Sequence, residues 1–149
     1  MRLLEAPGEA IVGGNQPITD NMNLESPAVL VIEDDLALRQ AIMHKLADSN
    51  VLTLYAHDAN SAIDQLREHP QIAVVWLDHT LPNGQTGIDV VTAIRTHPAW
   101  SRKEIVLISN ISDPALFQTY RNLGVARYYS KVDHPIAEIV TEIKRLLER

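Results

Sequence analysis

The sequence of 149 residues contains no cysteine, which excludes disulfides, thiolate metal sites and a cysteine nucleophile. It has no run of lysine or arginine and a formal net charge of -6, so a groove for nucleic acid is not expected. No apolar stretch approaches the roughly 20 residues of a membrane-spanning helix. The N-terminus develops no hydrophobic signal core. We therefore expect a cytoplasmic protein that does not insert into a membrane.

The composition is that of an ordinary soluble domain, with 46% hydrophobic and 21% charged residues. A chain of this length is long enough for one domain with a real core. Residues 1–26 differ from the rest, because glycine, proline and asparagine interrupt every periodic pattern. We expect a flexible N-terminal extension or linker there and one domain over residues 27–149. The alternative for the extension is a docking or dimerisation arm, for which residues 11–12 and 22–24 are the apolar candidates.

From Ala28 onward, short apolar runs alternate with segments of helical periodicity. Runs rich in β-branched and aliphatic residues favour buried parallel strands. Parallel strands joined by helices require right-handed crossovers, which place helices on both faces of the sheet. The sequence therefore predicts an α/β fold with three layers and a doubly wound, five-stranded parallel sheet. The expected strands are 28–32, 51–55, 72–77, 104–108 and 125–129, and the helical patterns are 38–46, 59–66, 88–94, 116–123 and 136–147.

Two of the expected strands run directly into carboxylates. Glu33 and Asp34 follow the first strand, and Asp78 follows the third. Because ligands bind at the carboxyl ends of the strands in such sheets, these residues indicate a shared acidic pocket. Like charges held close together need a cation or a proton. Ser109 ends the fourth strand, and Lys131 stands two residues past the fifth.

Several residues near this pocket have ordinary structural interpretations. A lone Asp at a strand end is usually a helix cap, and Asp35 is the expected cap of the first helix. The six histidines are scattered without metal-site spacing, and only His79 is near the chemistry. We expect its side chain to point away from the pocket, because adjacent residues on an extended chain face opposite sides. Trp76 is expected in the core and Trp100 in loop packing.

The order of these residues at the strand ends resembles the receiver domain of two-component response regulators. The resemblance covers about residues 28–148 and implies a flavodoxin-like topology. It implies Asp78 as the phosphoacceptor, Ser109 as the hydroxyl residue and Lys131 as the invariant lysine. It also assigns Glu33 and Asp34 as the acidic pair, the backbone carbonyl of Thr80 as a further metal ligand, and Tyr128 as the aromatic switch residue.

The chemistry of these residues is consistent with that resemblance. A carboxylate that attacks a phosphoryl group approaches another anion, and Mg²⁺ neutralises such charge while binding one or two carboxylates. We expect Glu33, Asp34, Asp78 and Thr80 to hold Mg²⁺. Lys131 and the Ser109 hydroxyl would then contact phosphoryl oxygens. The product is an acyl phosphate on Asp78.

The resemblance also implies a conformational switch. Once Asp78 is phosphorylated, Ser109 moves toward the new oxygens and Tyr128 turns inward. This movement remodels the face made by the fourth helix, the fifth strand and the fifth helix, which is also the expected surface for a homodimer. Two positions depart from the family pattern. Val132 stands where many receivers have proline, and Asn110 replaces a small residue; both bear on phosphoryl lifetime and donor preference.

We therefore expect a receiver that takes a phosphoryl group from a phosphohistidine of a sensor histidine kinase or a histidine phosphotransfer protein. It signals to a downstream protein, and it is not an enzyme beyond catalysing its own phosphorylation and dephosphorylation. Because the sequence ends after the fifth helix, a stand-alone receiver is expected. One alternative is a receiver fragment of a hybrid kinase. A phosphorylation-independent interaction module is another, and a metal-dependent phosphatase is disfavoured because Thr80 stands where such enzymes carry a second Asp.

Overall fold

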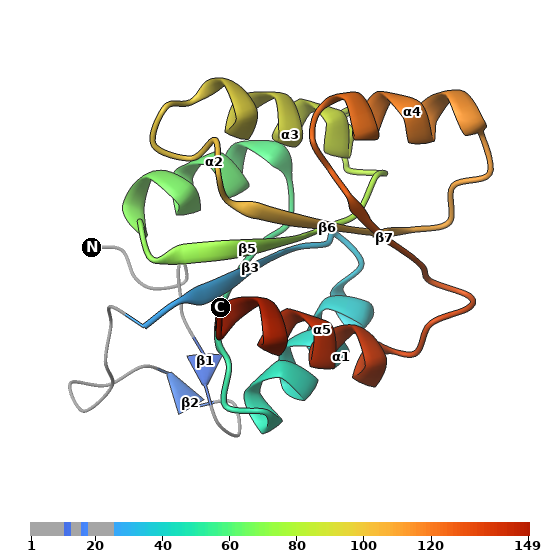
Figure 1. Ribbon diagram of the computed structural model, residues 1–149. Helices are drawn as coiled ribbons and strands as arrows, with labels where there is room; N and C mark the ends of the chain where they lie inside the picture. The colour runs from blue at the N-terminus through green and yellow to red at the C-terminus, as the bar shows by residue number, and fades with distance from the viewer. Residues whose placement is uncertain (1–10, 13–15, 18–25) are drawn as a thin grey trace.

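The computed structural model describes residues 11–12, 16–17 and 26–149, in which strands and helices alternate along the chain (Figure 1). The strands are β1 (Ile11–Val12), β2 (Gln16–Pro17), β3 (Ala28–Ile32), β4 (Leu52–Ala56), β5 (Ile72–Leu77), β6 (Glu104–Ser109) and β7 (Arg127–Ser130). The helices are α1 (Leu36–Asp48), α2 (Ala59–Glu68), α3 (Gly87–Thr96), α4 (Pro114–Asn122) and α5 (Ile136–Leu147).

The sheet has the strand order β2-β1-β4-β3-β5-β6-β7. Its five longer strands, β3 to β7, are all parallel. The chain runs from β3 to β4 on one side and then returns to β5 on the other, so the order reverses beside β3. This topology confirms the doubly wound, five-stranded parallel sheet. It also places a switch point, where open α/β sheets bind ligands, at the ends of β3 and β5.

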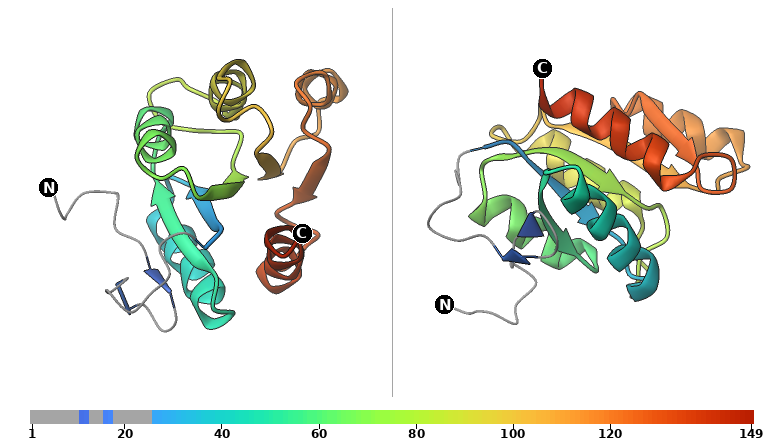
Figure 2. Two further views of the ribbon diagram at one scale, coloured as in Figure 1. Left: turned by 60° about the vertical axis from the view of Figure 1, so that its left-hand side comes forward. Right: turned by 90° about the horizontal axis from the view of Figure 1, so that it is seen from below.

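Helices cover both faces of the sheet. Helices α1 and α5 lie on one face, and α2, α3 and α4 lie on the other (Figures 1 and 2). Side chains of β3 alternate between the two faces: Val29 and Val31 pack toward α1 and α5, and Leu30 and Ile32 pack toward α2 and α3. Trp76 is 1% exposed, as expected for the core. The continuous apolar run of each strand follows from burial on both faces.

Polar residues fix where the helices begin. The Asp35 carboxylate accepts a hydrogen bond from the backbone N–H of Leu38 at 3.0 Å, which confirms its role as the cap of α1. Asp113 caps α4 in the same way, with Pro114 at the first helical position. None of the helices in the described part of the chain has the length and apolar character needed to cross a membrane.

The predicted bounds of the last strand, residues 125–129, were wrong at both the start and the end. The structure begins β7 at Arg127 rather than at residue 125, and ends it at Ser130. The cause is the end of α4, where Gly124 has a φ of +84° and the Val125 N–H donates to the Tyr120 carbonyl. Because β7 ends at Ser130, Lys131 follows it directly instead of standing two residues past it. The second predicted strand is likewise shifted by one residue, and the fourth extends to Ser109.

Most of the expected N-terminal extension, residues 1–26, lies outside the described residues. The described parts form β1 and β2, which pair antiparallel with each other. Ile11 also pairs antiparallel with Thr53 of β4. These two strands therefore extend the sheet at the β4 edge. The other apolar candidate for an arm, residues 22–24, is outside the described residues.

Candidate functional site

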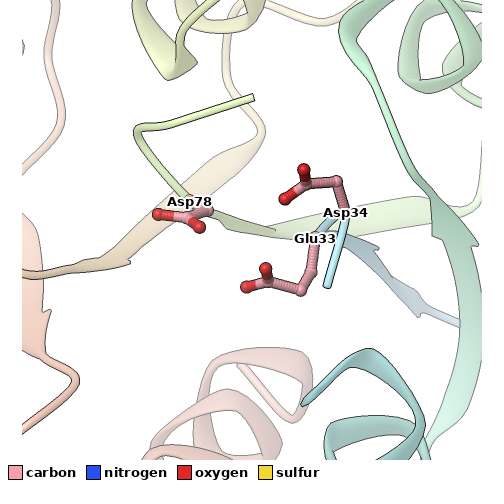
Figure 3. A group of neighbouring side chains, drawn as sticks. All are labelled: Glu33, Asp34 and Asp78. Carbon is pink, nitrogen blue, oxygen red and sulfur yellow. The ribbon is translucent and has the colours of Figure 1, made fainter. Parts of the chain in front are cut away.

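Three carboxylates meet at the switch point of the sheet. Glu33 and Asp34 follow β3, and Asp78 follows β5, its neighbour in the sheet. Each offers a carboxylate oxygen, and the three oxygens lie within 4.8 Å of one another. Figure 3 shows the three side chains beside one another at the ends of the two strands. Glu33 and Asp78 are buried, whereas Asp34 is exposed.

The ammonium group of Lys131 bridges two of these carboxylates. Its Nζ lies 3.2 Å from Glu33 Oε1 and 3.0 Å from Asp78 Oδ2. The lysine comes from the end of β7, two strands away from Asp78 in the sheet. Because a buried carboxylate pair is costly without a counter-charge, Lys131 stabilises the arrangement. The structure thus brings Glu33, Asp34, Asp78 and Lys131 together.

Further hydrogen bonds hold Glu33 in place. Its Oε2 accepts from the Asp35 backbone N–H at 3.2 Å, and its own backbone carbonyl accepts from Arg39 Nη1 at 3.0 Å. The Arg39 guanidinium lies over the Tyr55 ring, 5.0 Å from its centroid. These contacts fix the carboxylate on the Lys131 side of the pocket.

The electrostatics of the pocket follow from burial and crowding. Burial and the charge of Asp78 raise the pKa of Glu33, although Lys131 acts in the opposite direction. Burial alone would lower the pKa of Lys131, but its hydrogen bonds and ion pairs with Asp78 and Glu33 outweigh that effect and raise it. Lys131 therefore stays charged, and the pocket favours a further cation.

The raised pKa of Glu33 predicts a pH dependence of stability. Above its ordinary value of 4.5, the folded protein keeps the Glu33 proton while the unfolded chain releases it. The folded state then binds more protons, so the free energy of unfolding falls as the pH rises through this window. We expect Glu33→Gln to remove that part of the fall, measured by urea unfolding of the metal-free protein from pH 4.5 upward. An unchanged slope in the variant would contradict the assignment.

Ser109 and Tyr128 lie beside the pocket. Ser109 ends β6, the strand next to β5, and is buried. Its backbone carbonyl accepts from the Tyr128 hydroxyl at 2.8 Å, and that hydroxyl in turn accepts from the Ile111 N–H at 3.1 Å. The Tyr128 ring packs edge-on against Phe117 of α4, on the sheet face opposite that of Tyr129. The Tyr128 ring therefore links the end of β6 to the start of α4.

The loop between β5 and α3 closes as a tight turn. Thr80 pairs with Thr86, while Asn83 and Gly84 both have positive φ values, of 64° and 74°. The Pro-Asn-Gly sequence at residues 82–84 favours such a turn. Thr80 is exposed at the rim of the pocket, and its role as a metal ligand stays a prediction.

One contact beside the pocket had no signal in the sequence. His79 Nδ1 lies 2.5 Å from the Tyr120 hydroxyl of α4. The two residues are 41 positions apart, and Tyr120 fits the apolar phase of its helix like any core residue. No local pattern could have joined them.

Asn110, which departs from the family pattern, contacts the loop after β7. Its Oδ1 accepts from the Val132 N–H at 3.2 Å and from the Ser130 hydroxyl at 3.3 Å. The Val132 side chain itself is 77% exposed. Asn110 thus holds the backbone next to Lys131, the cation of the pocket.

The donor atoms of the pocket suit a hard cation. All three side-chain ligands are carboxylate oxygens, the type that Mg²⁺ prefers. Three carboxyl groups face one ammonium, so the pocket has more acidic groups than cations. Asp34, the exposed member, leaves the pocket open to solvent. The residues present therefore fit a magnesium ion with some water ligands.

A family model and several solved structures match this chain. Residues 29–144 match the model of the response regulator receiver domain. The fold is similar to that of the chemotaxis response regulator CheY4 of Vibrio cholerae, with 21% identity, a TM-score of 0.71, and coverage of 80% of this chain and 98% of that one. It is also similar to the receiver domain of Francisella response regulator 1452, with 22% identity, a TM-score of 0.72, and coverage of 83% and 98%. The receiver domain of a signal transduction histidine kinase from Syntrophus aciditrophicus gives 18% identity, a TM-score of 0.72, and coverage of 82% and 90%. A search of curated proteins finds none whose sequence matches.

Proposed function

Because the chain belongs to the response regulator receiver domain family, we propose that Asp78 accepts a phosphoryl group in a Mg²⁺-dependent reaction. The donor is a phosphohistidine of a sensor histidine kinase or a histidine phosphotransfer protein. The observation that carries the proposal is the pocket itself, in which one ammonium bridges two of three carboxylates that lie within 4.8 Å. Asp78 and Glu33 both contact Lys131, and Asp78 is chosen as the acceptor because it resembles the phosphoacceptor of the family, at the end of β5.

The transfer forms one bond and breaks one. An Asp78 carboxylate oxygen bonds to phosphorus while the bond from phosphorus to the imidazole nitrogen breaks, and that nitrogen leaves with a proton taken up from solvent. Such a reaction asks the protein for position and charge neutralisation more than for covalent chemistry. Lys131 supplies a compact cation beside Asp78, and Ser109 supplies a hydroxyl at the next strand end.

Glu33, Asp34, Asp78 and the Thr80 carbonyl would hold the metal ion. When bound, Mg²⁺ would neutralise charge on the phosphoryl oxygens. Glu33 is already engaged by Lys131 and the Asp35 N–H, which favours contact with the ion through water. Asp34, with its exposed carboxylate, is suited to direct contact.

The phosphorylated state signals through α4, β7 and α5. Tyr128 hydrogen-bonds the backbone at Ser109 and Ile111, so a shift of Ser109 toward the phosphoryl group disturbs the start of α4. A downstream protein, or a second copy of this chain, would bind the remodelled face. We place this exchange in the cytoplasm.

The protein catalyses only its own phosphorylation and dephosphorylation. A phosphatase that turns over needs an acid/base group near its aspartate nucleophile. Two residues after Asp78 stands Thr80, whose hydroxyl cannot serve as such a base. We therefore expect one phosphoryl group per chain at a time, held on Asp78.

The proposal is tested by incubation with Mg²⁺ and a small acyl phosphate, followed by intact-protein mass spectrometry. We expect the addition of one phosphoryl group, stable in acid and released by hydroxylamine, because an acyl phosphate forms. A chelator is expected to prevent the addition. Absence of labelling at saturating Mg²⁺ would overturn the proposal and leave the interaction module as the better account.

A further inference from the structure

Helix α4, all of whose residues are described, has Tyr120 as its one buried side chain. Tyr120 is 2% exposed, and its ring packs in the core formed with α2 and α3. The hydroxyl lies 2.5 Å from His79 Nδ1, and the two rings meet edge to face at 79° with centroids 5.6 Å apart. The residue that anchors α4 is therefore bonded to the residue that follows Asp78.

The Tyr120 hydroxyl occupies a confined place. A Cβ added at Gly87 would lie 2.6 Å from this hydroxyl and 2.8 Å from the Asp78 backbone carbonyl. Only glycine at the start of α3 thus admits both groups. The Gly87 N–H also donates to the His79 carbonyl at 2.7 Å. His79 is therefore held at its backbone by α3 and at its ring by α4.

The Tyr120 hydroxyl keeps its proton in this buried environment. Burial raises the pKa of Tyr120, and the charges of Asp78 and Asp89 raise it further. A protonated phenol can donate to His79 Nδ1, and losing a partner would leave a buried polar group unsatisfied. The geometry therefore makes this hydrogen bond costly to break.

We propose that Tyr120 and His79 act as a positioning pair that fixes the Asp78–Thr80 backbone for Mg²⁺ binding and ties that backbone directly to α4. This inference rests on the proposed function, because Asp78 and the Thr80 carbonyl are the ligands that the pair would position. Neither Tyr120 nor His79 touches the phosphoryl group or the ion. Their effect is to hold the ligands in place before the ion arrives, which lowers the entropy lost on binding.

The pair is a second connection between the pocket and α4. Tyr128 contacts Ile111 and packs against Phe117 of α4, whereas Tyr120 of α4 contacts the residue that follows Asp78. Coupling of this kind is reciprocal. Mg²⁺ binding therefore stabilises the packing of α4, and a protein bound to α4 alters the affinity for Mg²⁺.

Tyr120→Phe tests the proposal, because it keeps the ring and removes the hydroxyl. We expect the Mg²⁺ dissociation constant, measured by calorimetry, to rise roughly three- to tenfold. Without metal, we expect faster amide hydrogen exchange in α4 and in residues 79–87. Tyr129→Phe is the matched control, since Tyr129 packs on the opposite face of the sheet, and should change neither quantity.

Variants of His79 test the same link with Tyr120 unchanged. His79→Leu removes the ring nitrogen that bonds Tyr120, so it should raise the Mg²⁺ dissociation constant as much as Tyr120→Phe does. His79→Asn keeps a hydrogen-bonding group near the Nδ1 position and should recover much of the wild-type affinity. The double variant Tyr120→Phe/His79→Leu should bind Mg²⁺ as tightly as either single variant, because both substitutions remove the same hydrogen bond.

The outcomes distinguish a failure of the proposed function from a failure of the positioning pair. Absence of Mg²⁺ binding by the wild-type protein would overturn the proposed function. Amide hydrogen exchange of Tyr120→Phe without metal would then still test whether the hydrogen bond holds residues 79–87 against α4. Wild-type binding together with unchanged affinity and exchange in Tyr120→Phe overturns the positioning pair alone. Effects that multiply in the double variant would also overturn it, because they would show that the two residues act independently.

Discussion

Asp78→Asn is expected to abolish phosphoryl labelling by an acyl phosphate in the presence of Mg²⁺. The amide keeps the shape of the side chain and its place at the end of β5, but it has no anionic oxygen to attack phosphorus. Because the other carboxylates of the pocket remain, weak Mg²⁺ binding should persist. The measurement is intact-protein mass spectrometry alongside Mg²⁺ calorimetry.

Asp35→Asn is the matched control for this result. Asp35 stands two residues from Glu33 and carries a carboxylate, yet its side chain caps α1. Asparagine caps a helix about as well as aspartate, so the fold should not change. We expect wild-type labelling in this variant. Full labelling of Asp78→Asn, or loss of labelling in Asp35→Asn, would contradict the roles assigned to these residues.

Lys131→Met is expected to slow labelling by about 10²–10³-fold, the usual effect of removing one group that stabilises developing charge in a transition state. Lys131 Nζ lies 3.0 Å from Asp78 Oδ2, where it can contact a phosphoryl oxygen bound to Asp78. The same variant should bind Mg²⁺ at least as tightly as the wild type, because a competing cation has been removed. Labelling rate and Mg²⁺ affinity are measured on the same preparation.

A slower labelling rate without a loss of Mg²⁺ affinity would show that Lys131 acts on the phosphoryl group. Loss of both would show that Lys131 merely holds the pocket together. Lys144→Met, at an exposed position on α5, is the control and should leave both unchanged. An unchanged labelling rate in Lys131→Met would contradict the catalytic role.

Much of the fold could be predicted because each strand carries its own signal. The run at residues 28–32 and the run at 72–77 are apolar throughout, since both faces of a parallel sheet are covered. Their ends carry Glu33, Asp34 and Asp78, so topology alone brings the carboxylates together. The end of α4 was harder, because Val125 looks like a strand residue but its N–H completes the helix cap.

The contacts that could not be predicted are those between distant elements. The bond of His79 to Tyr120 and the bond of Arg39 to the Glu33 carbonyl depend on how helices sit against the sheet. Likewise, no periodic pattern in the sequence predicts the pairing of Ile11 with Thr53. In the sequence these residues look like ordinary core or surface residues, and their partners are known only from the packed structure.

Locating the phosphoryl group by peptide mass spectrometry tests whether Asp78 is the phosphoacceptor. The protein is labelled with an acyl phosphate and Mg²⁺, digested in acid, and the modified peptide is sequenced by fragmentation. We expect one hydroxylamine-sensitive phosphoryl group, on Asp78. A phosphoryl group on Asp34, on Asp35 or on the ring of His79 would contradict it.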